Sequence, residues 1–213
     1  MTYKTCLFDM DGTVLDTIAD LRDAVNHTLA LYGHPACDTQ RVKDATGNGA
    51  RNLIAHCLPQ GEATPDFEAI FSAYKSYYAA HSCIKTAPYE GITALLQELR
   101  GNGCKVAIVS NKPDGAVKEL AARFFPGIPA FGEAGLPRKP APDMVLAILK
   151  DLHVSPAQAV YIGDSEVDLE TAKNAGLPCI SVDWGFRTRP FLRAHGARVI
   201  VSSPRELIPL LMG

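Results

Sequence analysis

The chain has 213 residues, of which 47% are hydrophobic and 21% charged, as expected for a globular protein with one large domain or a main domain carrying a smaller insert. Its formal net charge of -2 argues against a general nucleic-acid or membrane-surface binder, because such proteins usually carry a basic excess. We therefore expect neither a nucleic acid nor a membrane as a partner.

The 6 cysteines form no C-x-x-C pair and no Cys/His cluster with zinc-like spacing. They stand mostly in apolar surroundings, which is typical of buried free thiols in a reducing compartment. The first residues lack the long apolar segment of a signal peptide, and no apolar run approaches transmembrane length. These features predict a cytoplasmic protein.

A short strand is expected at residues 3–8, and the pattern that follows is helical and poor in strands up to about residue 87. Helices are expected at 20–31, 53–58 and 67–80, with a sharp glycine-rich loop at 47–49. After residue 91 helices alternate with strands. The expected helices are 92–100, 115–124, 142–152 and 166–175, and the expected strands are 105–109, 128–131, 159–162, 178–182 and 199–201.

This alternation predicts an α/β fold with a doubly wound, parallel, Rossmann-like sheet and right-handed crossovers. The first strand has no candidate partner before residue 105, so the helical segment reads as an insertion into the sheet domain. The predicted division is an α/β core of residues 1–15 and 87–213 and a helical cap of residues 16–86. Because the insert leaves just after the first polar motif, it is well placed to act as a lid.

Two carboxylates, Asp9 and Asp11, stand where the first strand should end. In open α/β sheets ligands bind beyond the carboxyl ends of the strands, and a pair of acids there is costly unless a cation neutralises it. Gly12 lets the backbone approach a ligand closely, and its N–H can point at an anion. The motif therefore suggests a cation, an anion and an attacking carboxylate, and the alternative is an Asp-rich turn.

Two further strand ends carry polar side chains of complementary type. Ser110 and Asn111 offer a hydroxyl and an amide to an anionic oxygen, although both residue types also favour helix caps and turns. Lys139 is held near prolines at the start of a helix, where a fixed ammonium could balance charge on a phosphoryl group. The alternative for Lys139 is a solvated basic turn.

The last polar strand end holds Asp164 and Asp168, with Ser165 placed to cap the following helix. The helix dipole would explain Asp168 but not Asp164. Two or three carboxylates with positions left for water and phosphate suit Mg²⁺ as a cofactor. The chain has neither a dinucleotide-binding fingerprint nor a Walker loop.

The four motifs in this order, D-x-D-G-T, S-N, K-P and G-D-x-x-x-D, resemble those of the haloacid dehalogenase-like hydrolase superfamily. The resemblance covers essentially the whole chain, including a helical cap inserted after the first motif. Within the superfamily the chain is most similar to phosphoglycolate phosphatases, on residues 11–17, 47–49, 111–113 and 163–168.

The resemblance implies a role for each motif residue. Asp9 would be the nucleophile that forms an aspartyl-phosphate, and Asp11 would protonate the leaving oxygen and then activate water. Mg²⁺ would be held by Asp9, the backbone carbonyl of Asp11 and Asp164, with Asp168 supporting the metal site. The transferring phosphoryl group would be bound by Ser110, Asn111 and Lys139, beside the Gly12 N–H group.

The expected activity is thus Mg²⁺-dependent hydrolysis of a small phosphorylated metabolite, with phosphoglycolate as the first substrate to test. Dehalogenases lack the second acid, whereas Asp11 is present here. A pyrophosphatase, a nucleotide phosphatase and a phosphoglucomutase-like sugar-phosphate mutase share the motifs and stay open. A non-catalytic binding module would predict loss of Asp9 or Asp11. We expect a monomer or a homodimer.

The loop that joins two expected cap helices contains Gly49 and Arg51. Glycine there allows close approach to a ligand, so we expect this loop to close over the site. Arg51 could steer the carboxylate of a substrate such as phosphoglycolate, because a guanidinium pairs well with a carboxylate. The alternative is a plain interhelical turn with Arg51 in solvent.

Overall fold

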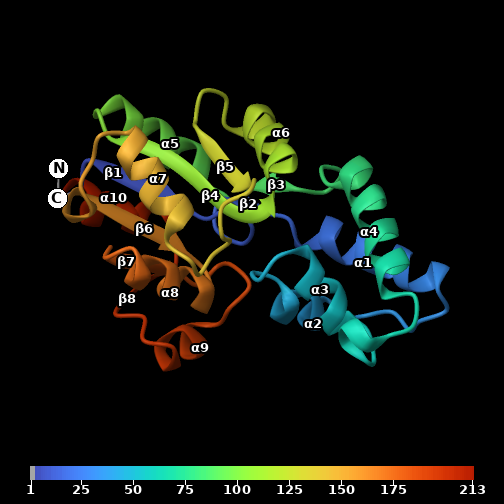
Figure 1. Cartoon of the computed structure of the whole chain (residues 1–213). Coiled ribbons are helices and arrows are strands. Elements are labelled where there is room, and N and C mark those ends of the chain that lie inside the picture. Colours follow the sequence, from blue (N-terminus) through green and yellow to red (C-terminus); the bar gives the residue numbers. More distant parts are fainter. Residues whose placement is uncertain (1–2) are drawn as a thin grey trace.

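The apolar strand β1 (Thr5–Phe8) is fully buried and lies inside a six-stranded sheet in the computed structural model, which describes residues 3–213. Every pairing in this sheet is parallel, and the strand order is β5-β4-β1-β6-β7-β8 (Figure 1). The predicted parallel α/β sheet is therefore confirmed. Its other strands are β4 (Lys105–Pro113), β5 (Ala130–Glu133), β6 (Ala159–Gly163), β7 (Cys179–Val182) and β8 (Val199–Val201).

Helices cover both faces of the sheet because alternate strand residues point to opposite sides. Cys6 and Phe8 pack on one face, in a cluster with α5 (Ile92–Gly101), α6 (Asp114–Phe124) and α10 (Pro204–Met212). Leu7 packs on the other face, with α7 (Asp143–Asp151) and α8 (Glu166–Asn174). The doubly wound arrangement positions the carboxyl ends of β4, β1 and β6 side by side.

The helical segment forms a second lobe with its own apolar cluster, beyond the end of the sheet opposite the chain termini (Figure 1). Its elements are α1 (Ile18–Leu31), α2 (Thr39–Ala45), α3 (Ala50–Cys57), the 3₁₀ turn η1 (Gly61–Ala63) and α4 (Phe67–His81), and the short strands β2 (Leu15–Asp16) and β3 (Ala87–Pro88) flank it. We call residues 16–86 the cap segment and the remainder the core. This division stays a prediction, and the antiparallel pair β2–β3 marks the two crossings between the lobes.

Asp20, at the start of α1, fastens the outgoing and returning chain at the base of the cap segment. Its buried carboxylate accepts backbone hydrogen bonds from Ile84 at 3.0 Å, Lys85 at 2.9 Å and Thr86 at 2.8 Å. The two chain segments that connect the core with the cap segment are thus held together by hydrogen bonds.

Several elements lie outside the sequence-based expectation. α2 buries only Val42 and Ala45 and owes its start to Asp38, which accepts a hydrogen bond from the Arg41 N–H at 2.7 Å. α10 contains Pro209, which hides its helical pattern, and α9 (Arg189–Ala194) is short. The 3₁₀ turn η2 (Pro156–Gln158) precedes β6. β4 runs on to Pro113, beyond the expected end at residue 109.

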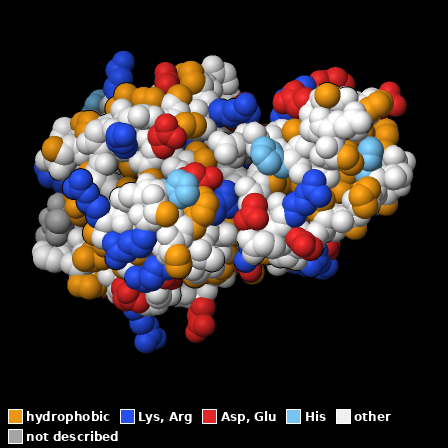
Figure 2. All heavy atoms as spheres, turned by 90° about the horizontal axis from the view of Figure 1, so that it is seen from below, with side chains coloured by type: hydrophobic (Ala, Val, Ile, Leu, Met, Phe, Trp, Pro, Cys, Tyr) orange, Lys and Arg blue, Asp and Glu red, His pale blue; other side chains and the backbone are white. Residues whose placement is uncertain are grey.

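The cysteines are all free: Cys6, Cys37, Cys57 and Cys104 are buried, and Cys83 and Cys179 half-buried. None of the helices in residues 3–213 combines the length and the apolar character needed to cross a membrane. Figure 2 shows a larger and a smaller lobe, with acidic and basic side chains interspersed on the face in view.

Candidate active site

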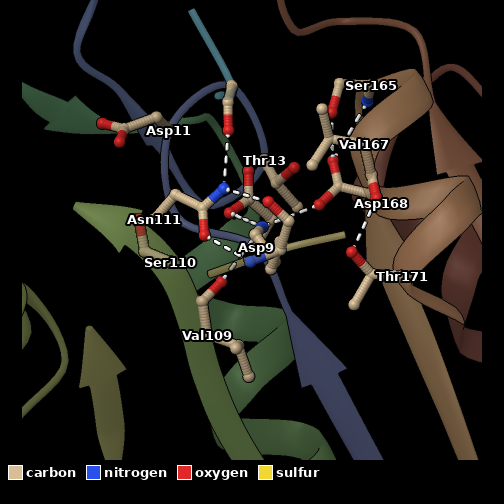
Figure 3. Close-up of polar contacts among 12 residues, drawn as sticks. Asp9, Asp11, Thr13, Val109, Ser110, Asn111, Ser165, Val167, Asp168 and Thr171 are labelled. Carbon is tan, nitrogen blue, oxygen red and sulfur yellow. Dashed lines mark hydrogen bonds and ion pairs between the residues drawn. The ribbon is translucent and has the colours of Figure 1, made fainter. Parts of the chain in front are cut away.

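Side chains from three neighbouring strand ends converge at a cavity that the cap segment also lines, and Figure 3 shows Asp9, Ser110 and Asn111 of this group together with Asp168. Asp9 follows β1, Ser110 and Asn111 lie in β4, and Asp164 follows β6. All four are buried. The parallel sheet therefore brings together residues that are far apart in sequence, as the strand-end motifs predict.

Asp9, Asp164 and Asp168 form a buried acidic group, in which one carboxylate oxygen from each residue lies within 4.8 Å of the others. Burial, followed by the charge of Asp168, raises the pKa of Asp9 well above its ordinary value, and burial and Asp168 raise the pKa of Asp164 to about 7. An arrangement of this kind fits a hard divalent cation, because oxygen ligands are present and their mutual repulsion needs a counter-charge.

Lys139 supplies part of that counter-charge from below. Its Nζ lies 2.7 Å from Asp9 Oδ1 and 2.8 Å from Asp168 Oδ1, and it donates to the Tyr161 hydroxyl at 3.0 Å. One ammonium therefore links two of the three acids. It leaves a net negative group that a cation or a protonated carboxyl must balance.

Asp164 is oriented by the loops around it. Its Oδ1 accepts a hydrogen bond from the Thr13 hydroxyl at 3.1 Å, and its Oδ2 accepts one from the Phe186 backbone N–H at 2.7 Å. A Cβ atom added to Gly12 or Gly185 would collide with the Asp164 carboxylate. Gly12 also has φ of 83°, a left-handed conformation that favours glycine.

Asp168 has a second task besides facing the acidic group. It forms a capping box with Ser165, whose N–H and hydroxyl donate to Asp168 Oδ2 at 3.1 Å and 2.7 Å. The predicted cap by Ser165 is therefore present. Asp168 therefore ties the start of α8 to Lys139 while it faces the acidic group.

Asp11 stands apart, with its carboxylate turned away from Asp9 and Asp168 in Figure 3. It accepts a hydrogen bond from the Thr17 hydroxyl at 2.6 Å and pairs with Lys112 Nζ at 3.1 Å. Lys112 is buried and also donates to the Tyr78 hydroxyl of α4 at 2.7 Å. The sequence offered only the adjacency of Lys112 to Asn111 as a signal for this contact.

Asn111 has its amide fully engaged. Its Nδ2 donates to the carbonyls of Lys139 at 2.8 Å and Gly47 at 2.9 Å, and its Oδ1 accepts from the Lys139 N–H at 2.7 Å. It therefore ties the Lys139 turn to the cap loop. Ser110 Oγ accepts from the Lys112 N–H at 3.2 Å, which leaves its own hydroxyl hydrogen available as a donor.

A cavity of about 290 Å³ opens above these groups, between the core and the cap segment. Its floor includes Asp9, Asp11 and Asp164, and much of its cap wall is apolar or aromatic, from Leu21, Gly49, Ala50, Leu53, Tyr74, Tyr78 and Ala79. Gly49 of the expected cap loop thus borders the cavity.

Arg51 is not among the residues that line this cavity, and its expected role in steering a substrate carboxylate stays a prediction. Its guanidinium pairs with Glu62 at 2.8 Å and Glu68 at 2.6 Å and lies over the Phe67 ring, 4.7 Å from the centroid. Two carboxylates and an aromatic face inside the cap segment hold the side chain there. The Arg51 side chain is still 35% exposed, so these contacts form an ion-pair cluster at the surface of the cap segment.

Residues 6–182 match the protein family described as haloacid dehalogenase-like hydrolase. The chain is 32% identical to the N-acetylmuramic acid 6-phosphate phosphatase of Pseudomonas aeruginosa, over 99% of this chain and 96% of that protein. It is 31% identical to phosphoglycolate phosphatase 1 of the same organism, over 97% of this chain and 79% of that protein. A solved structure of a provisionally assigned phosphoglycolate phosphatase from Lactobacillus delbrueckii subsp. bulgaricus is 39% identical, with a TM-score of 0.95 and full coverage of both chains.

Proposed function

This chain belongs to the haloacid dehalogenase-like hydrolases, and we propose that it hydrolyses small phosphomonoesters with Mg²⁺ through an aspartyl-phosphate on Asp9. The observation that carries the proposal is the buried acidic group of Asp9, Asp164 and Asp168 beneath a cavity that Asp11 also lines. Membership of this hydrolase family and an acidic group suited to a metal ion both support this chemistry. The metal's identity and the residue roles are part of the proposal.

In the first half-reaction an Asp9 oxygen attacks phosphorus, and the bond between phosphorus and the leaving oxygen breaks. Asp11 gives its proton to the leaving alcohol. In the second half-reaction Asp11 takes a proton from water, whose oxygen attacks the phosphorus of the aspartyl-phosphate. The bond between phosphorus and the Asp9 oxygen breaks, which frees inorganic phosphate and the Asp9 carboxylate and leaves Asp11 protonated for the next cycle. The pair that Asp11 makes with Lys112 at 3.1 Å would stabilise its carboxylate between the two steps.

The cation would be held by Asp9, Asp164 and the Asp11 carbonyl, with Asp168 in support. Bound there, it supplies positive charge against the approach of a carboxylate to an anionic phosphate. Lys139, already within 2.7 Å of Asp9, would add a second positive charge near the transferred group. The Ser110 hydroxyl and the Gly12 N–H would donate hydrogen bonds to its oxygens.

For the substrate we propose a phosphomonoester whose leaving group carries a carboxylate, with phosphoglycolate as the first to test. Three of the four Lys and Arg residues that line the cavity form ion pairs: Lys112 with Asp11, Lys139 with Asp9 and Asp168, and Arg187 with Glu166. Among the described residues, Lys75 has no ion-pair partner, and its ammonium lies 4.7 Å from the Phe71 ring centroid. It takes the place that the sequence suggested for Arg51.

N-acetylmuramic acid 6-phosphate is a second candidate, because the relative named for it matches almost end to end and its leaving group also bears a carboxylate. The cavity of about 290 Å³ is close to the lower end of typical small-molecule sites, roughly 300–1,000 Å³, which leaves room for a leaving group larger than glycolate. The two substrates therefore share a chemistry that Lys75 could recognise, and they differ in size.

A substrate panel with and without Mg²⁺ tests the proposal. It would contain phosphoglycolate, N-acetylmuramic acid 6-phosphate, neutral sugar phosphates, nucleotides, pyrophosphate and an aryl phosphate. We expect phosphate release from phosphomonoesters that needs Mg²⁺ and is lost in Asp9→Asn. Preference for pyrophosphate or nucleotides, or interconversion of sugar phosphates without phosphate release, would favour the corresponding alternative and contradict the proposal.

A further inference from the structure

The loop between β7 and α9 sends two core residues, Phe186 and Arg187, into the cap segment. Phe186 belongs to the apolar cluster of the cap segment although it follows a strand of the core. Both residues are 5% exposed. Residues 186–187 therefore form a buried contact between the lobes, and we call them the latch.

Arg187 holds core and cap segment at once. On the core side its Nε donates to Glu166 Oε2 at 2.9 Å. On the cap side it donates to the backbone carbonyls of Lys43 at 2.6 Å, Asp44 at 3.2 Å and Thr46 at 3.0 Å. These carbonyls lie at the carboxyl end of α2, where a helix leaves acceptors unpaired and its dipole favours a cation.

Phe186 of the latch also contacts the acidic group. The Phe186 N–H donates to Asp164 Oδ2 at 2.7 Å, directly beside the Arg187 side chain that grips α2. Just beyond Thr46, the Gly47 carbonyl accepts from Asn111 Nδ2 at 2.9 Å. The loop after α2 is therefore pinned over the cavity from two sides, by Arg187 and by Asn111, and both pins come from the core.

From these contacts we infer that the latch holds the cap segment closed over Asp9 and couples this closure to the orientation of Asp164, which makes Arg187 a positioning residue for catalysis. The inference rests on the proposed function for its catalytic part. Opening the cap segment would separate Arg187 from three carbonyls and expose Phe186 to water. Opening would also free the loop that places Asp164. Closure of the cap segment and alignment of the Asp164 carboxylate would thus be gained and lost together.

The first test is hydrogen exchange, which does not depend on catalysis. Arg187→Ala should speed amide exchange in residues 43–49 by about tenfold or more. The reason is that losing one charge-assisted hydrogen bond changes the free energy of opening by about as much as a tenfold change in rate requires. Exchange in β6 should stay as in the parent protein. Unchanged protection of residues 43–49 in a folded Arg187→Ala protein would overturn the latch, whatever the protein hydrolyses.

Arg189→Ala is the matched control. Arg189 lies two residues further on and is also tied down, through Asp183 at 2.6 Å and the Ser202 hydroxyl at 2.9 Å, but these partners belong to the core. Amide exchange in residues 43–49 of the Arg189→Ala variant should equal that of the parent protein. If Arg189→Ala loosens the segment as much as Arg187→Ala, the effect is not specific to the latch and the inference fails.

Kinetics separate positioning from plain stability. With an aryl phosphate and saturating Mg²⁺, Arg187→Ala should lower kcat by about tenfold or more with a smaller change in KM, and Arg187→Lys should restore part of kcat. Glu166→Gln weakens only the contact of Arg187 with the core, and it should also lower kcat. This variant replaces Arg187→Ala in the test if Arg187→Ala does not fold. Unchanged kcat in folded variants with loosened 43–49 segments would refute the coupling to Asp164. An inactive parent protein would instead refute the proposed function.

Discussion

The floor of the cavity and its cap wall are built on opposite principles. On the floor, Asp9, Asp164 and Asp168 each make short contacts to groups fixed by neighbouring parallel strands and their loops. On the cap wall, Leu21 and Leu53 offer no polar groups. Under the proposed function, the core would fix the chemistry and the cap segment would select the leaving group by shape and by few polar contacts.

The largest effect should come from the floor. Asp9→Asn removes the proposed nucleophile, and we expect kcat to fall by on the order of 10⁴–10⁶-fold, the range seen when a covalent catalyst loses a nucleophile or its partner acid. The fold should survive, since Asp168 still pairs with Lys139 at 2.8 Å. Steady-state assays on an aryl phosphate, with circular dichroism as the control for folding, check this. Near-normal turnover would assign the nucleophile elsewhere.

The next largest effect should come from removing the metal ion that we propose for the floor. Chelation should abolish turnover, and added Mg²⁺ should restore it, because the acidic group repels an anionic phosphate without a cation. Asp164→Ala should raise the Mg²⁺ concentration needed for half-maximal activity by about tenfold or more. Mg²⁺ titrations of parent and variant measure this shift. Full activity in chelator after dialysis would contradict the role of the acidic group.

Without metal, the floor should also destabilise the protein as pH rises. Burial and Asp168 raise the pKa of Asp164 from 3.8 to about 7, so the folded state binds a proton more tightly than the unfolded chain. Its stabilising contribution is present at low pH and is lost between about pH 4 and pH 7, by at most about 4 kcal/mol. Asp164→Asn should reduce this slope, and Mg²⁺ should offset the loss. Denaturant unfolding at pH 5 and pH 7.5 in chelator measures both, and equal slopes in parent and variant would count against the prediction.

The smallest effect belongs to the cap wall. Lys75→Gln should lower kcat/KM for phosphoglycolate a few-fold, because an exposed ion pair contributes about 0.2–1 kcal/mol. Turnover of a neutral phosphomonoester of similar size should not change. Lys118→Gln, another exposed lysine whose partner is Asp114 in the core helix α6, is the control. Equal losses of kcat/KM on both substrates would show that Lys75 does not recognise the substrate carboxylate.

The strand-end residues could be predicted from sequence because each motif directly follows a short apolar strand. Parallel strands align their carboxyl ends, so Asp9, Ser110 and Asp164 had to meet once the sheet formed. The position of Asp168 followed likewise from one helical turn after Ser165. Local pattern was sufficient for these residues.

Contacts made by the cap segment could not be predicted in this way. Arg51 looked free in the sequence, but its partners Glu62 and Glu68 reach it only after α3 and α4 pack. The latch arises from a loop whose sequence has no periodic pattern and whose partners are backbone carbonyls. A backbone acceptor leaves no trace in residue identity, so only the folded geometry reveals it.

The most direct measurement of the central claim uses Asp11→Asn, which should still accept a phosphoryl group from 4-nitrophenyl phosphate because nitrophenolate leaves without a proton. It should release that group slowly, since no base activates water. With Mg²⁺, intact mass should rise by about 80 Da, peptide mapping should place the gain on Asp9, and Asp9→Asn/Asp11→Asn should show no gain. A nitrophenol burst with no covalent gain, or with the gain on another residue, would contradict the account.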